Sequence, residues 1–303
     1  MKKIIITGAN SYIGTSFEKY VIDKYHDDFA IKTVDMISDD WRSLDFSEAD
    51  IVFHVAGIAH ADVGNVSEEI KAKYFAVNRD LALEVAKKAK EDGSKQFVFM
   101  SSAIVYGDSA PYGKDKRITK ETIPNPSNFY GDSKWQADKG VREFADNEFK
   151  VTVLRPPMIY GKGSKGNYPL LAKLAKKIPV FPNVINERSM LYIDNLCEFL
   201  AQVMLRGESG VFWPQNSEYT RTSEMVKMIS DVHGHRMMIS KVWNPLVSVA
   251  AHLPGKIGRI TNKAFGNLSY DQEMSVYDFE YQIVDLKRSI ERTEGNETNT
   301  VSC

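Results

Sequence analysis

Three side chains in the first half of the chain have the types and the spacing needed to move a proton. Tyr130 and Lys134, in NFYGDSKWQAD (128–138), are four residues apart and therefore share one face of a helix. A tyrosine with a pKa near 10 is a poor base at neutral pH, but a lysine ammonium one turn away favours the phenolate. Ser102, in FVFMSSAIVYG (97–107), can hold a reacting hydroxyl group while Tyr130 removes its proton. We therefore expect these three residues to form a catalytic set.

A Tyr-x-x-x-Lys spacing occurs by chance on many helices, so the prediction gains weight from a second motif upstream. KKIIITGANSYIG (2–14) predicts a buried strand that turns at Gly8 into a helix near Gly14. The amino terminus of such a helix points free N–H groups and a positive dipole at a phosphate. The alternative is an ordinary strand-turn-helix without a ligand. Asp35 follows at about the distance where an acidic residue binds ribose hydroxyls, which favours NAD over NADP.

Short apolar runs and helical patterns alternate through the first half of the chain. The runs predict strands at 3–7, 30–35, 50–56, 96–101 and 150–155. Runs that are apolar at nearly every position suit strands buried on both faces, as in a parallel sheet with helices on each side. A helix is predicted over 67–91. Only 14 residues separate Asp35 from Asp50, which predicts one shortened crossover.

The alternation becomes irregular after about residue 155, where Gly, Pro and Lys become frequent. We predict an α/β protein with a doubly wound, parallel sheet formed by residues 1–160 and about 189–210. A smaller α/β domain, formed by 161–188 and 211–303, would lie over the carboxyl ends of the strands. The chain would then consist of a larger domain that contains the sheet and a smaller domain that covers one end of it.

The composition argues against several classes of protein. The formal net charge of -1 and a pI of about 6.6 give no global field that favours nucleic acid or an anionic membrane. Two cysteines, Cys197 and Cys303, are too few for a disulfide framework and fit a reducing compartment. No apolar run predicts a transmembrane segment or a secretory signal, so we expect a cytoplasmic protein. The polar tail at 292–303 is expected to be frayed.

The histidines and one apolar segment have weaker predictions. His54 lies in a predicted strand and is expected to be a hydrogen-bonded core residue, and His60 lies just beyond it. His233 and His235 have a metal-like spacing without further ligands, so no metal site is predicted. WNPLVSVAAHLPGKIG (243–258) is an apolar patch with a basic end. Domain core, dimer surface and peripheral membrane contact all remain open for this patch.

Taken together, these motifs resemble the extended short-chain dehydrogenase/reductase family, in particular its NAD-dependent nucleotide-sugar epimerases and dehydratases of the UDP-glucose 4-epimerase type. The resemblance runs from residue 2 to about residue 200. It rests on TGANSYIG, HVAGIAH, VN (77–78), SSAIVYG, YGDSK, LRPPMIYGKG and RSMLYIDNL. It implies a Rossmann domain, a smaller sugar-nucleotide domain, and a possible homodimer through a four-helix contact.

The resemblance also assigns roles to individual residues. It makes Ser102, Tyr130 and Lys134 the catalytic residues. It implies that NAD is contacted by Gly8, Ser11, Tyr12, Ile13, Gly14, Asp35, Ala56, Asn78, Tyr130 and Lys134. Family members usually carry glycine at the position of Ser11, whose hydroxyl and N–H could still donate to a phosphate. We therefore expect NAD to bind, with less room at this point of the loop.

Three further residues match substrate positions in the family. Asn167 and Tyr168 match positions that meet the nucleotide, and Arg188 matches an arginine that pairs with a substrate phosphate. The alternative for Arg188 is a surface ion pair with Glu187 or Asp194, and Asp194 itself is expected to cap a helix. A further departure lies at position 158, where Met158 replaces an asparagine that often contacts the substrate diphosphate.

Enzymes with this scaffold catalyse three reactions. A 4,6-dehydratase needs an Asp-Glu pair after the catalytic serine, and Ala103 and Ile104 stand there instead, so we do not expect a dehydratase. A 4-epimerase needs only the Ser-Tyr-Lys set and a retained NAD, whereas a 4-keto-sugar reductase uses the same residues with exchangeable NAD(P)H. Asp35 favours the epimerase, acting on a UDP-hexose or UDP-N-acetylhexosamine in bacterial surface-polysaccharide synthesis. A catalytically silent NAD-binding regulator is a third alternative, which the intact Ser-Tyr-Lys set disfavours.

Overall fold

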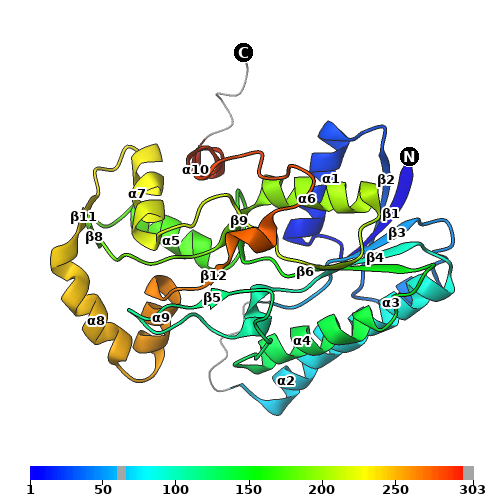
Figure 1. Cartoon of the computed structure of the whole chain (residues 1–303), viewed down its shortest axis with the longest axis horizontal. Coiled ribbons are helices and arrows are strands. Elements are labelled where there is room, and N and C mark those ends of the chain that lie inside the picture. The colour runs from blue at the N-terminus through cyan, green and yellow to red at the C-terminus, as the bar shows by residue number, and fades with distance from the viewer. Residues whose placement is uncertain (60–65, 296–303) are drawn as a thin grey trace.

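The computed structural model describes residues 1–59 and 66–295, and its centre is a parallel sheet of six strands (Figure 1). In spatial order the strands are β10 (Gly210–Phe212), β6 (Lys150–Leu154), β4 (Gln96–Met100), β3 (Ile51–His54), β1 (Lys2–Thr7) and β2 (Phe29–Val34). All five predicted strands are confirmed. Strand β10 is an addition, because a three-residue strand leaves almost no periodic signal in the sequence.

Helices cover both faces of this sheet, as predicted for strands that are apolar throughout (Figure 1). On one face, α1 (Tyr12–Lys24) and α6 (Ile193–Arg206) pack on a core that includes Phe53. On the other face, α3 (Leu81–Glu91) and α4 (Phe129–Arg142) pack on a core that includes Phe97. Both phenylalanines are fully buried, and each such ring contributes about 1.5–3 kcal/mol by its removal from water. The doubly wound Rossmann sheet is therefore confirmed.

Two connections position the site residues. Between β2 and β3 the chain forms only a 3-10 turn at Asp39–Ser43, so the predicted short crossover is confirmed. Trp41 in that turn is buried and joins the core where a helix would otherwise lie. The helix predicted over 67–91 is interrupted: α2 (Glu68–Phe75) and α3 are joined by a π-helical turn at Ala76–Asp80. Such single π turns are frequent at functional sites.

A second, smaller part of the chain lies beyond the carboxyl ends of the sheet strands (Figure 1). It contains α5 (Asn167–Ala175), β8 (Val180–Pro182), α7 (Thr222–Val232), β11 (Met238–Ser240), α8 (Asn244–His252) and α9 (Lys256–Phe265). Two short parallel pairs connect it to the sheet: β7 (Met158–Tyr160) with β9 (Met190–Tyr192), and β5 (Arg117–Ile118) with β12 (Ser269–Tyr270). The predicted boundary at 210 was too early, because β10 continues to Phe212 and pairs with β6 in the large sheet.

The last described helix, α10 (Leu286–Glu294), enters the stretch that was expected to be frayed. Its final residue is held in place, because Glu294 accepts from His233 at 2.6 Å and pairs with Lys176 at 2.9 Å. The expectation was therefore wrong for 292–294, while 296–303, with Cys303, lie outside the described residues. No helix in the described part of the chain is long and apolar enough to cross a membrane.

Candidate active site

The loop between β1 and α1 requires glycine at its first position. Gly8 has a φ of +117°, and a Cβ atom there would lie 2.7 Å from the backbone nitrogen of Ala56. The loop after β3 is drawn this close because the N–H groups of Val55 and Ala56 both donate to the carbonyl of Thr7, at 3.0 and 2.9 Å. The loops after two neighbouring strands therefore form one edge, at the point where the strand order reverses, which is where dinucleotides bind in such sheets.

Ser11 caps helix α1 and does not strain the loop. Its hydroxyl oxygen accepts from the N–H of Gly14 at 3.2 Å, and its φ of -71° is open to any residue. Its own N–H donates to the carbonyl of Gly8 at 3.2 Å, so this N–H is engaged within the turn. The N–H groups of Tyr12 and Ile13, also in the first helical turn, have no hydrogen-bond partner among the described residues. We infer that a phosphate would be bound by these two groups and by the hydroxyl hydrogen of Ser11.

The side chains of Tyr12 and Asp35 differ in their position at this edge. The Tyr12 hydroxyl is buried against Gly161 and has no partner among the described residues, so only its backbone faces the loop. Asp35 directly follows β2 and is exposed, and one of its carboxylate oxygens accepts from the N–H of Ile37 at 2.9 Å. Its second oxygen is available to a ribose hydroxyl group, as the sequence predicts.

Asn78 lies in the π turn and holds the loop after β3 in place. Its side-chain oxygen accepts from the N–H of Ile58 at 2.8 Å, and its nitrogen donates to the carbonyl of Ile58 at 3.0 Å. The same nitrogen donates to Ser133 of α4 at 3.2 Å. A Cβ atom on Gly57 would lie 3.2 Å from Asn78 and 3.3 Å from the Nζ of Lys134. The loop therefore lies between Asn78 and the predicted catalytic lysine.

The structure brings Ser102, Tyr130 and Lys134 together at the carboxyl end of β4. Ser102 begins a 3-10 turn and accepts from the N–H of Ile104 at 3.3 Å, and its hydroxyl lies near enough to Tyr130 to affect the pKa of the phenol. Helix α4 can approach this turn because Gly131 has no side chain; a Cβ atom there would lie 2.9 Å from the Ile104 carbonyl. The predicted catalytic residues thus form one cluster, in which the backbone of Ile104 contacts both Ser102 and helix α4.

Burial sets the ionisation of this cluster. Burial raises the pKa of Tyr130 to about 12, the neighbouring Tyr74 adds to the rise, and the nearby Ser102 hydroxyl opposes it. Burial lowers the pKa of Lys134 to about 8, while the carboxylate of Asp138 opposes the fall. The Lys134 ammonium donates to the carbonyl of Met100 at 3.0 Å. The phenol is thus kept protonated in the free protein, and a further positive charge is needed to release its proton.

Replacing Lys134 by methionine should stabilise the fold while it removes activity. The unfolded lysine has a pKa near 10.5, so the buried ammonium costs up to about 3 kcal/mol below pH 8. Between pH 8 and 10.5 only the unfolded chain keeps this proton, so the cost falls as the pH rises. We expect the variant to be more stable than wild type below pH 8 and the difference to close by pH 10.5, in urea unfolding at each pH. A difference that does not change with pH would contradict a buried ammonium.

A buried ion pair supports helix α4 and was not predicted from the sequence. Asp138, one turn beyond Lys134, accepts two hydrogen bonds of 2.8 Å from Arg155 at the end of β6. Both side chains are buried, at 0% and 5% exposure. Arg155 also donates to the Tyr106 hydroxyl at 2.7 Å. No sequence spacing connects these three positions, because the pair joins a helix to a strand.

A small apolar cavity of about 160 Å³ in the second part of the structure contains two of the three predicted substrate residues. Asn167 and Arg188 both line it, together with Met158. Tyr168 is not brought to this cavity: it is 3% exposed and stacks on Tyr160 in the core, with ring centroids 5.5 Å apart. Tyr168 follows Asn167 on a helix and therefore points about 100° away from it.

Arg188 has no carboxylate partner within ion-pair distance among the described residues, so the ion-pair alternative was wrong. It donates to the Gly266 carbonyl at 2.8 Å and to Ser109 at 3.2 Å. Glu187 pairs with Arg117 instead, and Asp194 pairs with Arg292. Burial without a counter-charge lowers the pKa of Arg188 to about 10, which leaves it cationic at neutral pH. An anion in the cavity would offset the free-energy cost of burying the Arg188 charge without a counter-charge.

The remaining predictions concern residues outside the cavity. Asp194 lies in the first turn of α6 and does not cap it, since Tyr192 holds the cap position without a side-chain bond. His54 is a buried core residue that shares a 2.7 Å hydrogen bond with Thr7, as predicted. His233 pairs with Glu294, and no group of metal-binding side chains occurs in residues 1–59 and 66–295. His60 lies outside the described residues.

Comparison with known proteins agrees with this geometry. The sequence model of the NAD dependent epimerase/dehydratase family matches residues 4–212. The chain belongs to this family. It is therefore an NAD-dependent enzyme of the epimerase and reductase type, as predicted, and the expected NAD cofactor is the cofactor of the family.

Two curated relatives are epimerases. A UDP-glucose 4-epimerase of Vibrio cholerae is 28% identical over 251 residues, which cover 76% of this chain and 75% of that protein. An N-acetyl-alpha-D-glucosaminyl-diphospho-ditrans,octacis-undecaprenol 4-epimerase of Escherichia coli O157:H7 is 32% identical over 218 residues, 65% of this chain and 61% of that protein. Reductases and a dehydratase share the fold as well.

A solved structure shows the same fold over nearly the whole chain. The UDP-glucuronic acid 4-epimerase of Bacillus cereus, in complex with NAD, superimposes with a TM-score of 0.71 at 15% identity. The match covers 96% of this chain and 97% of that one. At this identity the likeness establishes the fold alone.

Proposed function

We propose that this chain is an NAD-dependent 4-epimerase of a sugar carried on a diphosphate. The observation that carries the proposal is the cluster of Ser102, Tyr130 and Lys134 beside the loop held by Asn78. The predicted carrier is UDP, bearing a hexose or an N-acetylhexosamine. The apolar cavity beside Arg188 also suits a polyprenyl diphosphate carrier, which the name of the E. coli relative contains.

Ser102, Tyr130 and Lys134 would each have a separate role in the epimerisation. Bound NAD would supply a nicotinamide C4 that takes a hydride from the sugar carbon and returns it to the opposite face. Ser102 would hold the sugar hydroxyl, and Tyr130, with its proton lost, would accept the hydroxyl proton. The positive charge of Lys134 and of the cofactor ring would stabilise the phenolate. Tyr130 would give the same proton back at the end, so no proton is consumed.

The alternatives are an NAD(P)H-dependent 4-keto-sugar reductase and a non-catalytic NAD-binding regulator. Retention of the cofactor separates these possibilities, because only an epimerase regenerates its own NAD. The purified protein should release close to one NAD per chain on denaturation, measured by mass spectrometry. It should then interconvert the 4-epimers without added cofactor. An empty protein that consumes added NAD(P)H would instead identify a reductase, and a protein that binds NAD but shows neither activity would be the regulator.

Asp35 supports the preference for NAD over NADP. Its exposed carboxylate would bind the ribose hydroxyls of NAD and repel the 2′-phosphate of NADP. Replacing Asp35 by alanine should weaken NAD binding by about tenfold and leave NADP binding unchanged or stronger. Isothermal titration of the cofactor-free protein measures both. An equal loss for the two nucleotides would show that Asp35 does not select between them.

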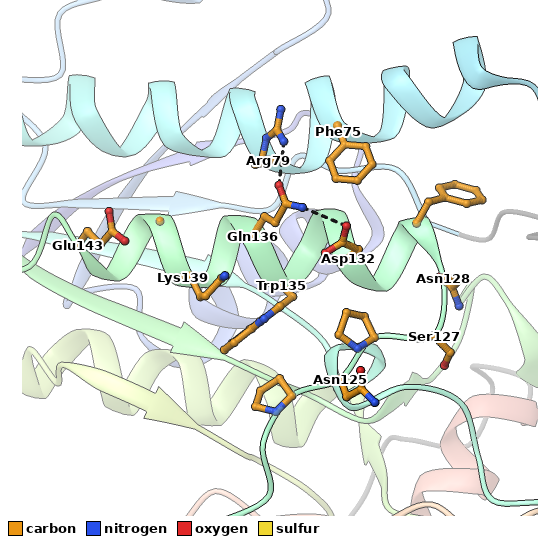
Figure 2. Close-up of a pocket in the computed structure, with 14 residues that line it drawn as sticks. Phe75, Arg79, Asn125, Ser127, Asn128, Asp132, Trp135, Gln136, Lys139 and Glu143 are labelled. Carbon is orange, nitrogen blue, oxygen red and sulfur yellow. Dashed lines mark hydrogen bonds between the residues drawn. The ribbon is translucent and has the colours of Figure 1, made fainter.

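An open groove of about 1040 Å³ lies on the outer side of α4 and lacks the catalytic residues (Figure 2). Phe75, Arg79 and Trp135 line it, and Gln136 accepts from Arg79 at 2.8 Å. We propose that this surface, formed by α2, the π turn and α4, contributes to the four-helix homodimer that the resemblance implies. Light scattering measures whether the protein is a dimer in solution.

A cytoplasmic role in bacterial surface-polysaccharide synthesis also stays a prediction, based on composition and resemblance.

A further inference from the structure

Helices α8 and α9 form a hairpin at the tip of the second part of the structure (Figure 1). Seventeen large apolar side chains are exposed in the described part of the chain, and eight of them lie between residues 238 and 260. Val242 just before α8, Leu246 and Val249 on it, and Leu253 just after it form one stripe at helical spacing, and Ile257 begins another on α9. Exposed apolar side chains that are clustered in this way mark a contact surface, unlike scattered ones.

The same segment carries only positive charge. Residues 232–270 contain five Lys and Arg and no Asp or Glu, although the whole chain has 39 basic and 40 acidic residues. Lys256 and Lys263 are exposed on α9 beside the apolar stripe, and neither lies within ion-pair distance of a described carboxylate. Apolar residues flanked by lysines on one side of a helix are typical of segments that lie in the interface of an anionic bilayer.

The hairpin is continuous with the cavity that holds Arg188. Ile260 and Lys263 are exposed on α9 and also line that cavity. The other lining side chains include three methionines and two leucines, and none of the described residues that line the cavity has an aromatic ring to stack on a base. Thr222, one of the few polar ones, already donates to Ala264 at 2.6 Å and accepts from Asn186 at 3.1 Å. The cavity thus offers a cation and apolar walls, and few polar or aromatic groups that could bind a nucleoside specifically.

We propose that the α8–α9 hairpin docks on an anionic membrane and that the substrate diphosphate is carried there by a polyprenyl lipid. This inference rests on the proposed 4-epimerase function and names the carrier. Arg188 binds the diphosphate, and the first prenyl units lie against Met158, Met190 and Ile260. The hairpin places the mouth of the cavity at the bilayer surface, so the lipid chain stays in the membrane while the sugar reaches Tyr130.

A second copy of the chain is a poorer occupant of this surface. A two-fold contact between two hairpins would bring the same patch together with itself, so cations would face cations. The segment has no carboxylate that could compensate them. An anionic lipid surface supplies both the negative charge and the apolar layer that the two stripes require.

Membrane docking can be tested by sedimentation of the full chain with vesicles. The protein should bind vesicles of phosphatidylcholine with phosphatidylglycerol, bind poorly to phosphatidylcholine alone, and be released by high salt. The double variant Leu246→Glu, Val249→Glu should bind at least about tenfold less. Ile22→Glu, at a position on α1 that is as exposed as Leu246, is the matched control and should bind like wild type.

Equal binding of the double variant and wild type, or no binding to anionic vesicles, would overturn the docking proposal. Loss of a dimer in the double variant, seen by light scattering without any vesicle binding, would assign the hairpin to a second copy and overturn it as well. Both altered side chains are exposed, so thermal unfolding should be unchanged. That measurement separates lost docking from lost folding.

The carrier is tested with one sugar on two carriers. The NAD-loaded protein is given polyprenyl diphosphate N-acetylglucosamine in vesicles, or UDP-N-acetylglucosamine, and the released sugar is analysed for its C4 epimer. We expect epimerisation of the lipid-linked sugar at a kcat/KM at least about tenfold above that of the nucleotide sugar. Preference for the UDP sugar would overturn the lipid carrier and leave the 4-epimerase intact. With these sugars and their hexose counterparts, absence of any epimerisation would overturn the proposed function itself.

Discussion

Replacing Tyr130 by phenylalanine is expected to lower kcat by about 10²–10⁴-fold and to leave NAD binding intact. The change removes the only atom that the mechanism uses to accept a proton. It keeps the ring that packs edge-on against Tyr74, with centroids 6.0 Å apart. Burial raises the Tyr130 pKa, so the phenol is neutral at pH 7. The substitution therefore removes no charged group and should not destabilise the fold.

Tyr74→Phe is the matched control, because it removes a hydroxyl from the adjoining ring and keeps the same packing. Its kcat should stay within a few-fold of wild type. Both variants are assayed by single-turnover epimerisation, with bound NAD quantified in each preparation. Near wild-type turnover in the Tyr130 variant would assign the proton transfer to another group and remove the basis of the proposed mechanism.

Replacing Asp138 by asparagine is expected to cost about 3–5 kcal/mol of unfolding free energy. The substitution leaves the Arg155 guanidinium buried without a counter-charge, among the rings of Tyr106, Trp135 and Trp213. Ring faces attract the cation, but each contributes only about 0.5–2 kcal/mol, less than a buried carboxylate that accepts two 2.8 Å hydrogen bonds.

The control for this prediction is provided by a second arginine on the same carboxylate. Arg142 also donates to Asp138, at 3.2 Å, but its side chain is 37% exposed. Arg142→Ala should therefore cost no more than about 1 kcal/mol. Urea unfolding of the two variants gives the comparison. A loss in the Asp138 variant as small as that in the Arg142 variant would mean that water reaches Arg155.

The proposed catalytic half of the site could be located from the sequence because its residues belong to local patterns. Gly8 and Gly14 flank a strand-to-helix turn, and Tyr130 and Lys134 lie one helical turn apart. Within each of these two pairs, the spacing alone indicates that the residues are neighbours. Asp138 and Arg155 could not be paired in this way, because their contact depends on how α4 lies on the sheet. The direction of the Tyr168 side chain depends likewise on the rotation of α5, which is set by packing.

The exposed hairpin shows a second limit of sequence reasoning. Residues 243–258 are apolar enough to be core, and the sequence left core, dimer surface and membrane contact open. Only the structure shows that Leu246 and Val249 point away from the protein while Val247 is buried. An amphipathic helix buries its apolar face whether it packs in the core, on a second subunit or on a membrane. The sequence does not show which of these three covers that face.

The pairing of β5 with β12 also sets the order in which the two halves of the site can form during synthesis. Every strand of the six-stranded sheet has left the ribosome once Phe212 has emerged, but Tyr270, which donates to the Arg155 carbonyl at 2.7 Å, follows later. The partner of Arg188 at Gly266 is equally late. At about 5–20 residues per second the delay is roughly 3–12 seconds. A nascent chain can therefore acquire its NAD before it has a place for the sugar.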